Sequence, residues 1–320
     1  MGTYLIALSF SAGSASPELI HFFNTYHFPM MNDEARAYAY RDALLRSIRP
    51  GDTVLEIGTG GGLLAMMAGR IVQDRGGHVY SVEGAPGLAE LAREVVTLNK
   101  LSEHVTVIAN FSTSLRLEQM KFRRADVLFS ETLGTHLLEE GQLNWIADAR
   151  GRLTTDAVRI IPGSARQYIT LVESQPWLTH PVEGVEVQEH LPKGFVHSAR
   201  CIGGDLTAPV VALEVDFYKH SVMDLPLPRT RLTKRVKVLR DGTLHGAYSH
   251  FDTFEQGSYE GLMMSTHPAQ QSLPRQMAWG LLYAALPRPL TVHRGEALAL
   301  ILEYHTGGKY EIVSVSRATE

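Results

Sequence analysis

Hydrophobic and polar positions follow two different patterns along the chain. From about residue 30 to 162, short apolar runs alternate with segments of helical period. Strands are expected at 53–57, 78–82, 105–109 and 125–129, and helices at 32–48, 63–72 and 86–99. Asn32 is the expected cap of the first of these helices. Strands that alternate with helices predict a parallel sheet with helices on both faces.

From about residue 163 onward, short β-rich runs dominate. Strands are expected at 166–172, 210–217, 231–238, 243–251, 297–304 and 310–315. Asp241-Gly242 and Gly307-Gly308 lie between pairs of these runs, as hairpin turns do. The pattern predicts a second, antiparallel domain, either a barrel or a sandwich. Residues 174–205 have no clear period and are expected to form a long loop or an inserted arm.

Composition narrows the functional class. The net charge of −4 argues against a nucleic-acid partner, because phosphate binding needs a basic face. The single cysteine, Cys201, excludes an internal disulfide and a cysteine-rich zinc site, and the 14 histidines lack ligand spacing. No basic stretch precedes the apolar start, and no apolar run reaches the ~18 residues of a membrane span. We therefore expect a soluble cytoplasmic protein without a metal.

A glycine-rich loop follows the first expected strand and precedes a helix. It reads Glu-Ile-Gly-Thr-Gly-Gly-Gly over 56–62, and its glycines let the backbone turn tightly and approach a ligand. Doubly wound sheets bind ligands at this edge, the carboxyl end of the strands. No lysine follows in the spacing of a triphosphate-binding loop. Glu83, at the end of the next strand, can accept both hydroxyls of a ribose, which fits a nicotinamide cofactor as well as S-adenosylmethionine.

Two glutamates follow the fourth expected strand. Glu131 and Glu140 are nine positions apart, so on one helix, at about 100° per residue, they would face opposite sides. They converge only if the chain reverses between them, and Gly134 permits this reversal. Two converging carboxylates form a cradle for a guanidinium, whose N–H donors lie in a planar fork. The alternative for this segment alone is a solvated acidic helix start.

Together these segments resemble the protein arginine methyltransferases, from about residue 22 to the C-terminus. The aromatic motif, the cofactor-covering helix, the nucleotide loop, the ribose-binding acid and the double-glutamate hairpin of that family match residues 22–26, 30–41, 54–62, 82–83 and 130–140. The double-glutamate spacing is the specific motif among them. The resemblance implies an α/β fold, with a Rossmann-like doubly wound domain over 1–162 and an antiparallel β-barrel domain over 163–320 that includes an arm at 174–205.

The resemblance also implies a role for each matched position. Glu131 and Glu140 would clamp the guanidinium as the catalytic pair. Arg36 would pair with the methionyl carboxylate of S-adenosylmethionine, and Met30 would pack near its sulfonium. The other implied contacts are Glu56, Gly58, Gly60, Glu83 and Ser112 to the cofactor, and Tyr26 and Trp279 to the substrate. Taken singly, Arg36 also fits an ordinary helix-face pair with Asp33, Met30 fits the core, and Ser112 fits a turn.

One position departs from the family. The family's Thr-His-Trp loop matches residues 277–279, where Ala278 stands in place of the histidine and Trp279 is kept. That histidine pairs in the family with the acid matched by Asp33, and His267 is a candidate substitute. The departure leaves the acceptor open among free arginine, another small guanidine, a peptide and protein-bound arginine.

The expected function is therefore S-adenosylmethionine-dependent methylation of a guanidino nitrogen by a homodimer, without nucleic-acid or membrane partners. Two other classes stay open. A nicotinamide-dependent oxidoreductase would share the glycine loop and Glu83 but leave the double-glutamate hairpin without a purpose. A non-catalytic, methyltransferase-like scaffold would account for the missing histidine.

Overall fold

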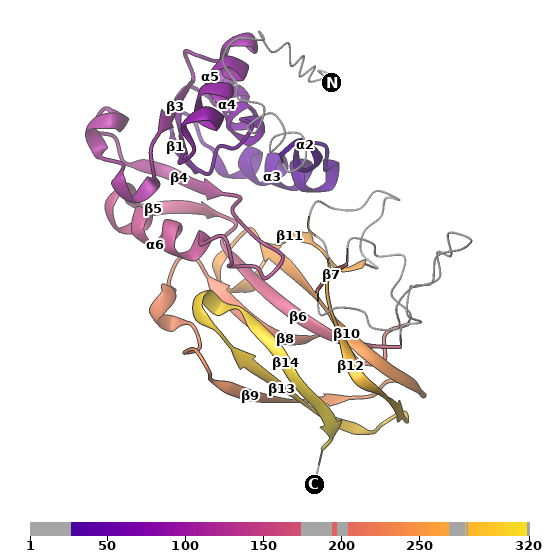
Figure 1. Ribbon diagram of the computed structural model, residues 1–320. Coiled ribbons are helices and arrows are strands. Elements are labelled where there is room, and N and C mark those ends of the chain that lie inside the picture. Colours follow the sequence, from indigo (N-terminus) through magenta and orange to yellow (C-terminus); the bar gives the residue numbers. More distant parts are fainter. Residues whose placement is uncertain (1–26, 174–193, 197–203, 269–278, 280, 319–320) are drawn as a thin grey trace.

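A parallel sheet forms the first part of the molecule (Figure 1). The computed structural model describes residues 27–173, 194–196, 204–268, 279 and 281–318. The sheet has the order β3-β2-β1-β4-β5, and every pairing in it is parallel. Its strands are β1 Thr53–Ile57, β2 His78–Glu83, β3 Val105–Ala109, β4 Ala125–Ser130 and β5 Thr154–Ile161. The order reverses between β1 and β4, where such sheets bind ligands beyond the strand ends.

Helices cover both faces of this sheet, as the alternating pattern predicts. The helices are α2 Phe28–Met31, α3 Glu34–Ser47, α4 Leu63–Arg75, α5 Pro86–Leu98 and α6 Gln142–Arg152, with short 3-10 turns at Ser112–Ser114 and Leu117–Met120. Buried residues of α3, α4 and α5 form one core with Val54 and Val79, and α6 packs on the other face with Leu55 and Tyr80.

The expected Asn32 cap is wrong. Asp33 is the N-cap of α3, and its carboxylate accepts a hydrogen bond from the Arg36 amide at 3.0 Å. Asn32 instead ends α2, where its side-chain amide donates to the Phe28 carbonyl. The short helix α2 explains why the cap of α3 lies one residue later than predicted. Asn32 ends α2, so Asp33 caps α3 in its place.

The second part is antiparallel throughout. One sheet has the order β7-β12-β10-β6-β8 with β11 on β10, and a three-stranded sheet has the order β14-β13-β9. The strands are β6 Ser164–Val172, β7 Gly194–Val196, β8 Val210–Asp216, β9 Arg231–Lys237, β10 Gly242–Phe254, β11 Leu262–Ser265, β12 Leu281–Val292, β13 Ala297–Tyr304 and β14 Tyr310–Arg317. The two sheets share one apolar core, which includes Ile169, Phe251 and Leu300.

Of the two expected hairpins, one is confirmed and one is wrong. β13 and β14 pair around the turn that holds Gly307 and Gly308, both with positive φ. The Asp241-Gly242 hairpin does not form, since β9 pairs with β13 whereas β10 pairs with β6 and β12. The chain crosses from one sheet to the other at this point. The pattern did not predict α2, β5, α6, β7, β11 and β12, and β7 lies within the 174–205 segment that was expected to be a loop or an arm.

The fold class is confirmed: a Rossmann-like parallel sheet followed by an antiparallel β domain. One core cluster joins residues of the parallel sheet, such as Leu55, to residues of both antiparallel sheets, so the two parts pack against each other. The division at residue 162 stays a prediction. Among the described residues, no helix is long and apolar enough to cross a membrane.

Candidate active site

The glycine loop after β1 has the backbone that only glycine adopts without strain. Gly58, Gly60 and Gly62 have φ of +85°, +52° and +83°. A Cβ on Gly58 would lie 2.7 Å from Cγ2 of Thr132, and one on Gly60 would lie 3.2 Å from the His27 ring. The loop therefore needs glycine both for its left-handed backbone and for its close approach to neighbouring segments.

Glu83 braces this loop from the end of β2. One carboxylate oxygen accepts the Gly60 amide at 2.8 Å, and the other accepts the Ala85 amide at 2.9 Å. A carboxylate has about four lone-pair sites, so each oxygen keeps acceptor capacity for a further donor. Glu83 can thus shape the loop and still receive hydroxyl groups from a ligand.

A buried carboxyl lies beneath the loop. Glu56, in β1, is 1% exposed, and its carboxylate accepts a hydrogen bond from the Ser81 hydroxyl. The Ser81 hydroxyl is also 2.5 Å from that of Thr59. Burial raises the pKa of Glu56 to about 8, although the Ser81 hydrogen bond opposes the shift. At neutral pH this side chain is therefore largely protonated and acts as a neutral hydrogen-bonding group.

The chain between Glu131 and Glu140 reverses as expected. Gly134 and Leu137 exchange backbone hydrogen bonds of 3.2 and 2.9 Å and form an isolated antiparallel bridge. Leu137, not Gly134, takes the left-handed conformation, with φ of +60°. Gly134 has little free space, because a Cβ there would lie 2.2 Å from Cγ of Glu139, whose side chain would have to move.

The β domain holds this hairpin in place. The indole N–H of Trp279 donates to the Leu133 carbonyl at 2.6 Å. The side-chain amide of Gln167, in β6, donates to the Thr135 carbonyl at 2.8 Å. Both side chains are buried, so these hydrogen bonds form away from water. The glutamate hairpin is thus positioned by the antiparallel part while its ends belong to the parallel part.

Arg36 and Glu131 form a buried ion pair. The Arg36 Nε donates to Oε2 of Glu131 at 2.8 Å, and Nη2 donates to the same oxygen. Their side chains are 8% and 4% exposed. Burial raises the pKa of Glu131, while Arg36 opposes the shift and the nearby Glu140 carboxylate adds to it. Glu131 and Glu140 line the same cavity, which is consistent with this influence of one carboxylate on the other.

These groups line one cavity of about 410 Å³ at the carboxyl edge of the parallel sheet. It brings together most of the residues expected at the site: Met30, Arg36, Glu56, Gly58, Gly60, Glu83, Glu131 and Glu140. They come from α2, α3, β1 and its loop, the end of β2, and the hairpin after β4. Residues far apart in the sequence therefore meet at the position where the strand order reverses.

Other expected residues lie elsewhere. Ser112 is buried in the 3-10 turn Ser112–Ser114, where its carbonyl accepts from Arg152 at 3.0 Å, and it does not line the cavity. The ring centroid of Trp279 is 5.9 Å from Cζ of Arg36, also outside the lining. Their roles at the adenine and the substrate stay predictions. Tyr26, Ala278 and most of the arm at 174–205 lie outside the described residues.

The two residues considered for the missing histidine are in different settings. Asp33 caps α3. His267 lies in the β domain, where its Nε2 is 3.0 Å from the Tyr248 hydroxyl and its ring packs edge-on against His250. A role for His267 as partner of Asp33 stays a prediction.

Several residues of the site were not expected, among them His27, Thr132 and Gln142. His27 and Thr132 line the cavity, and burial lowers the pKa of His27 to about 4, with a further contribution from Arg36. Gln142 is fully buried, and its Oε1 accepts the Thr132 amide at 3.0 Å, which fixes the base of the hairpin. Thr132 could have been found from its place beside Glu131, whereas nothing in the sequence distinguishes Gln142.

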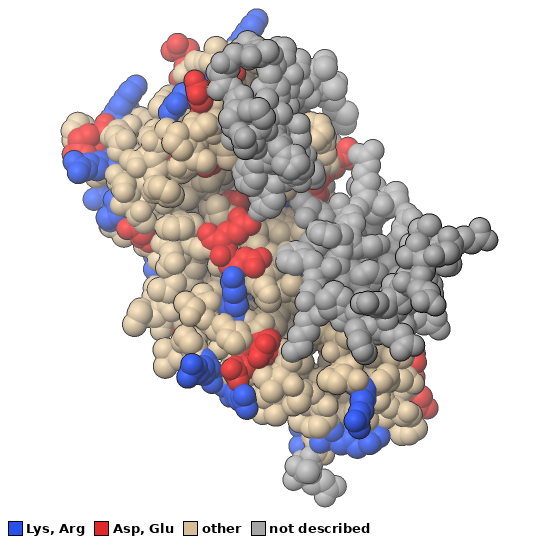
Figure 2. Space-filling view, viewed as in Figure 1, with Lys and Arg blue, Asp and Glu red and all other residues tan. Residues whose placement is uncertain are grey.

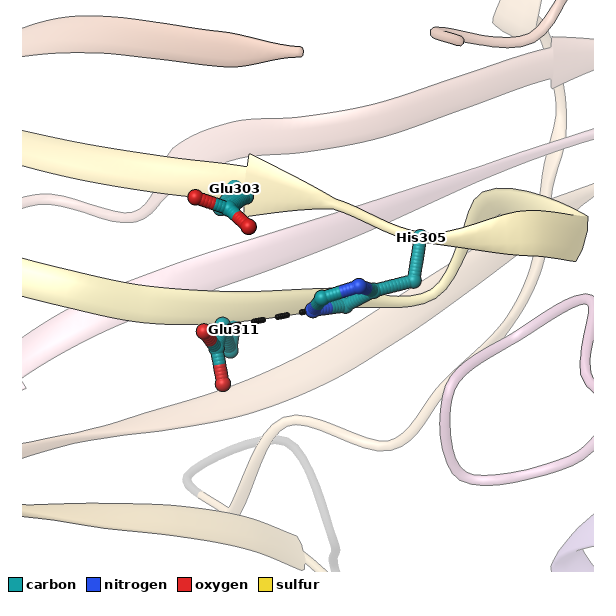
Figure 3. A group of neighbouring side chains, drawn as sticks. All are labelled: Glu303, His305 and Glu311. Carbon is teal, nitrogen blue, oxygen red and sulfur yellow. Dashed lines mark ion pairs between the residues drawn. The ribbon is translucent and has the colours of Figure 1, made fainter. Parts of the chain in front are cut away.

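Charge elsewhere on the molecule is mixed. On the face shown in Figure 2, acidic and basic side chains are interspersed and the basic ones form no continuous field. Glu303, His305 and Glu311 gather at one end of the β13–β14 hairpin with their ligand atoms within 4.8 Å of one another (Figure 3). Arg231 pairs with Glu303 at 2.5 Å, so a guanidinium already offsets the charge of the two facing carboxylates.

A family profile matches the part of the chain that builds the cavity. The profile of protein-L-isoaspartate(D-aspartate) O-methyltransferase (PCMT) matches residues 28–113. This range includes β1, the glycine loop and Glu83. This part of the chain is thus similar in sequence to a family of methyltransferases.

Proteins of similar sequence include arginine methyltransferases. The arginine N(omega)-methyltransferase of Streptomyces achromogenes subsp. streptozoticus is 40% identical over 149 residues, 47% of this chain and 40% of that protein. The protein arginine N-methyltransferase 7 of Oryza sativa subsp. japonica is 30% identical over 276 residues, 78% of this chain and 38% of that protein. The chain thus covers less than half the length of each of these relatives.

Two solved structures share the fold over about nine tenths of this chain. The Trypanosoma brucei PRMT1 enzyme-prozyme heterotetrameric complex with AdoHcy matches with a TM-score of 0.70 and 21% identity over 91% of this chain and 95% of that one. Arabidopsis thaliana protein arginine methyltransferase 10 matches with a TM-score of 0.69 and 21% identity over 89% and 95%. The chain is thus similar in sequence to part of these arginine methyltransferases, and it shares the fold of two protein arginine methyltransferase structures.

Proposed function

We propose that the protein transfers a methyl group from S-adenosylmethionine to a guanidino nitrogen of arginine. The observation that carries this proposal is the convergence of Glu131 and Glu140 on the cavity that the glycine loop and Glu83 also line. The cofactor carries its methyl on a sulfonium and is therefore already activated. The protein's main task is then to place the acceptor nitrogen in line with that methyl.

The residues of the cavity fit this cofactor. Glu83 keeps acceptor capacity for the two ribose hydroxyls, and the glycines leave room for close approach. Arg36, at the mouth of the hairpin, is the cationic group available for the methionyl carboxylate, and Met30 lines the same cavity. The name of the Trypanosoma relative records AdoHcy, the demethylated cofactor, which supports the same assignment.

The two glutamates would act on the acceptor. A guanidinium has a pKa above ~12 and does not readily lose a proton. Carboxylates that accept hydrogen bonds from two of its nitrogens hold positive charge there and leave the third nitrogen more nucleophilic. Glu131 and Glu140 would orient that nitrogen toward the methyl group that bound S-adenosylmethionine would supply, and one of the two carboxylates would accept the proton that the nitrogen loses. Burial of Glu131 strengthens its interaction with the guanidinium.

The acceptor stays a matter of proposal among free arginine, a small guanidine, a peptide and a protein. The Streptomyces relative is named an arginine N(omega)-methyltransferase and the rice relative a protein arginine N-methyltransferase. Incubation with labelled S-adenosylmethionine and each acceptor class decides between them. Label in none of the acceptors, with the cofactor still bound, would favour a non-catalytic scaffold. The nicotinamide-dependent oxidoreductase is not favoured, because it gives the paired glutamates no task.

We also propose a homodimer in the cytoplasm. The support is the family, whose Trypanosoma member is described as a heterotetrameric complex, and the single cysteine, which suits a reducing compartment. Light scattering at micromolar concentration tests the assembly. A monomeric mass would remove this part of the proposal and leave the catalytic part intact.

A further inference from the structure

One buried side chain closes the base of the glutamate hairpin. Gln142, the first residue of α6, is 0% exposed. Its Oε1 accepts the backbone N–H of Thr132 at 3.0 Å. A backbone N–H can only donate, so the acceptor must be the oxygen of the side-chain amide, and the orientation of that amide is fixed. This hydrogen bond joins the start of α6 to the segment that follows β4.

The hydrogen bond lies next to both glutamates in the chain. Thr132 directly follows Glu131, and Gln142 is the second residue after Glu140. The bond therefore fixes how far apart the backbone lies at the two ends of the hairpin. Gln142 itself does not line the active-site cavity, so it acts on the carboxylates only through the backbone that carries them.

The two ends of the hairpin are anchored to different elements. On the Glu131 side, the Ser130 hydroxyl donates to the Ile57 carbonyl at 2.9 Å, which ties the end of β4 to β1. On the Glu140 side, the indole N–H of Trp145 donates to the Glu140 carbonyl at 2.9 Å, which ties this residue to α6. Because α6 is not part of the sheet, the spacing of the two ends depends on how α6 is linked to the segment after β4. The side-chain amide at the base of the hairpin supplies that link.

Stability alone does not explain an amide at this position. The Nε2 of Gln142 is buried and has no hydrogen-bond partner in the described part of the chain. A buried donor without a partner typically costs at least as much free energy as one neutral hydrogen bond contributes. Methionine has a side chain of similar length and would fill the same space without an unpaired donor. The amide is therefore better explained by the geometry that it imposes than by the stability that it adds.

We propose that Gln142 is a positioning residue that sets the spacing of the Glu131 and Glu140 carboxylates. This inference rests on the proposed function, in which each carboxylate meets a different N–H group of the acceptor guanidinium. Without the hydrogen bond to Thr132, the Glu140 end of the hairpin shifts with α6 relative to the Glu131 end. A displacement of about 1 Å at the reacting groups lowers turnover by as much as about a hundredfold.

Gln142→Met and Gln142→Glu separate a positioning role from a structural one. Gln142→Met removes the acceptor and leaves no unpaired donor on this side chain. Its turnover of S-adenosylmethionine and acceptor should fall by about ten- to a hundredfold, while its midpoint of denaturant unfolding stays close to that of the wild-type protein. Gln142→Glu keeps an oxygen for the Thr132 amide, but a carboxyl group costs more to bury than an amide. Its midpoint should fall while its turnover stays above that of Gln142→Met.

Two further measurements complete the test. The affinity for S-adenosylhomocysteine, measured by calorimetry, should change far less than turnover in both variants. Asn144→Met, at an exposed position in the same turn of α6, is the control and should change neither turnover nor stability. Wild-type turnover in Gln142→Met, loss of its folded state, or turnover that follows stability across the two variants would overturn the proposal. Absence of turnover in the wild-type protein with every acceptor would instead contradict the proposed function on which the inference rests.

Discussion

Arg36 and Glu131 are 95 positions apart in the chain, yet two N–H groups of the arginine donate to one oxygen of the glutamate in the buried cavity. The protein's own guanidinium thus occupies part of the acceptor capacity of the clamp. A substrate guanidinium must share Glu131 with Arg36, and an anionic ligand group near Arg36 would weaken the internal pair. The two halves of the site are therefore linked through this contact.

Replacing Glu131 by Gln keeps its shape and removes its charge. We expect turnover to fall by about a hundredfold or more, the size of losing one preorganised electrostatic contact, while cofactor affinity changes far less. Single-turnover methylation and calorimetry measure the two quantities. Glu139→Gln, on the same hairpin but outside the cavity lining, is the control and should keep most of its turnover. Near-normal turnover in both Glu131→Gln and Glu140→Gln would end the clamp hypothesis.

Glu83→Ala should weaken the binding of S-adenosylhomocysteine by about 1.5–3 kcal/mol, the value of a hydrogen bond to a charged group. Part of that loss reflects the Gly60 and Ala85 amides, which also donate to this carboxylate. Glu90→Ala removes an exposed glutamate of α5 and should leave affinity unchanged. Calorimetry that gives equal affinity for the wild-type protein and Glu83→Ala would show that Glu83 does not hold the cofactor.

Gly58→Ala separates backbone strain from collision. Gly58 and Gly295 have nearly equal φ, +85° and +90°, but only Gly58 has a neighbour in reach, Cγ2 of Thr132 at 2.7 Å. Gly295→Ala should therefore cost only the left-handed strain, about 1–2 kcal/mol. Gly58→Ala should lower the free energy of unfolding by more than this and should also weaken cofactor binding. Denaturant unfolding of both variants gives the difference, and equal losses would show that the Thr132 contact relaxes freely.

Glu56 should make stability depend on pH. Its pKa is about 8 in the folded protein against 4.5 for the free group, so between these values the folded state holds a proton that the unfolded state has released. Stability therefore falls as pH rises through this window, by up to about 1.4 kcal/mol per unit. Glu56→Gln removes this dependence, so its stability relative to the wild-type protein should rise from pH 5 to pH 8. A constant difference in urea unfolding across that range would contradict the buried-acid assignment.

Much of the parallel sheet could be predicted from the sequence because its strands are short, apolar and separated by helices. β1 and β3 have the expected bounds. The predicted Asp241-Gly242 hairpin failed because a turn signal depends only on local sequence. The strand that pairs with β9 is decided instead by which of the two sheets buries its apolar face. Contacts between distant positions, such as the Arg36–Glu131 pair, leave no local pattern. The prediction that the two glutamates converge held because their spacing allows convergence only through a reversal.

Two side chains of the β domain, Trp279 and Gln167, donate hydrogen bonds to backbone carbonyl groups of the hairpin that carries both glutamates. The positions of the two glutamates therefore depend on the junction between the two parts. A chimaera that joins this parallel sheet to the β domain of a relative would keep the proposed cofactor site. The distance between the carboxylates of Glu131 and Glu140 would change. Acceptor preference could then be altered by grafting the β domain, with no substitution at either glutamate.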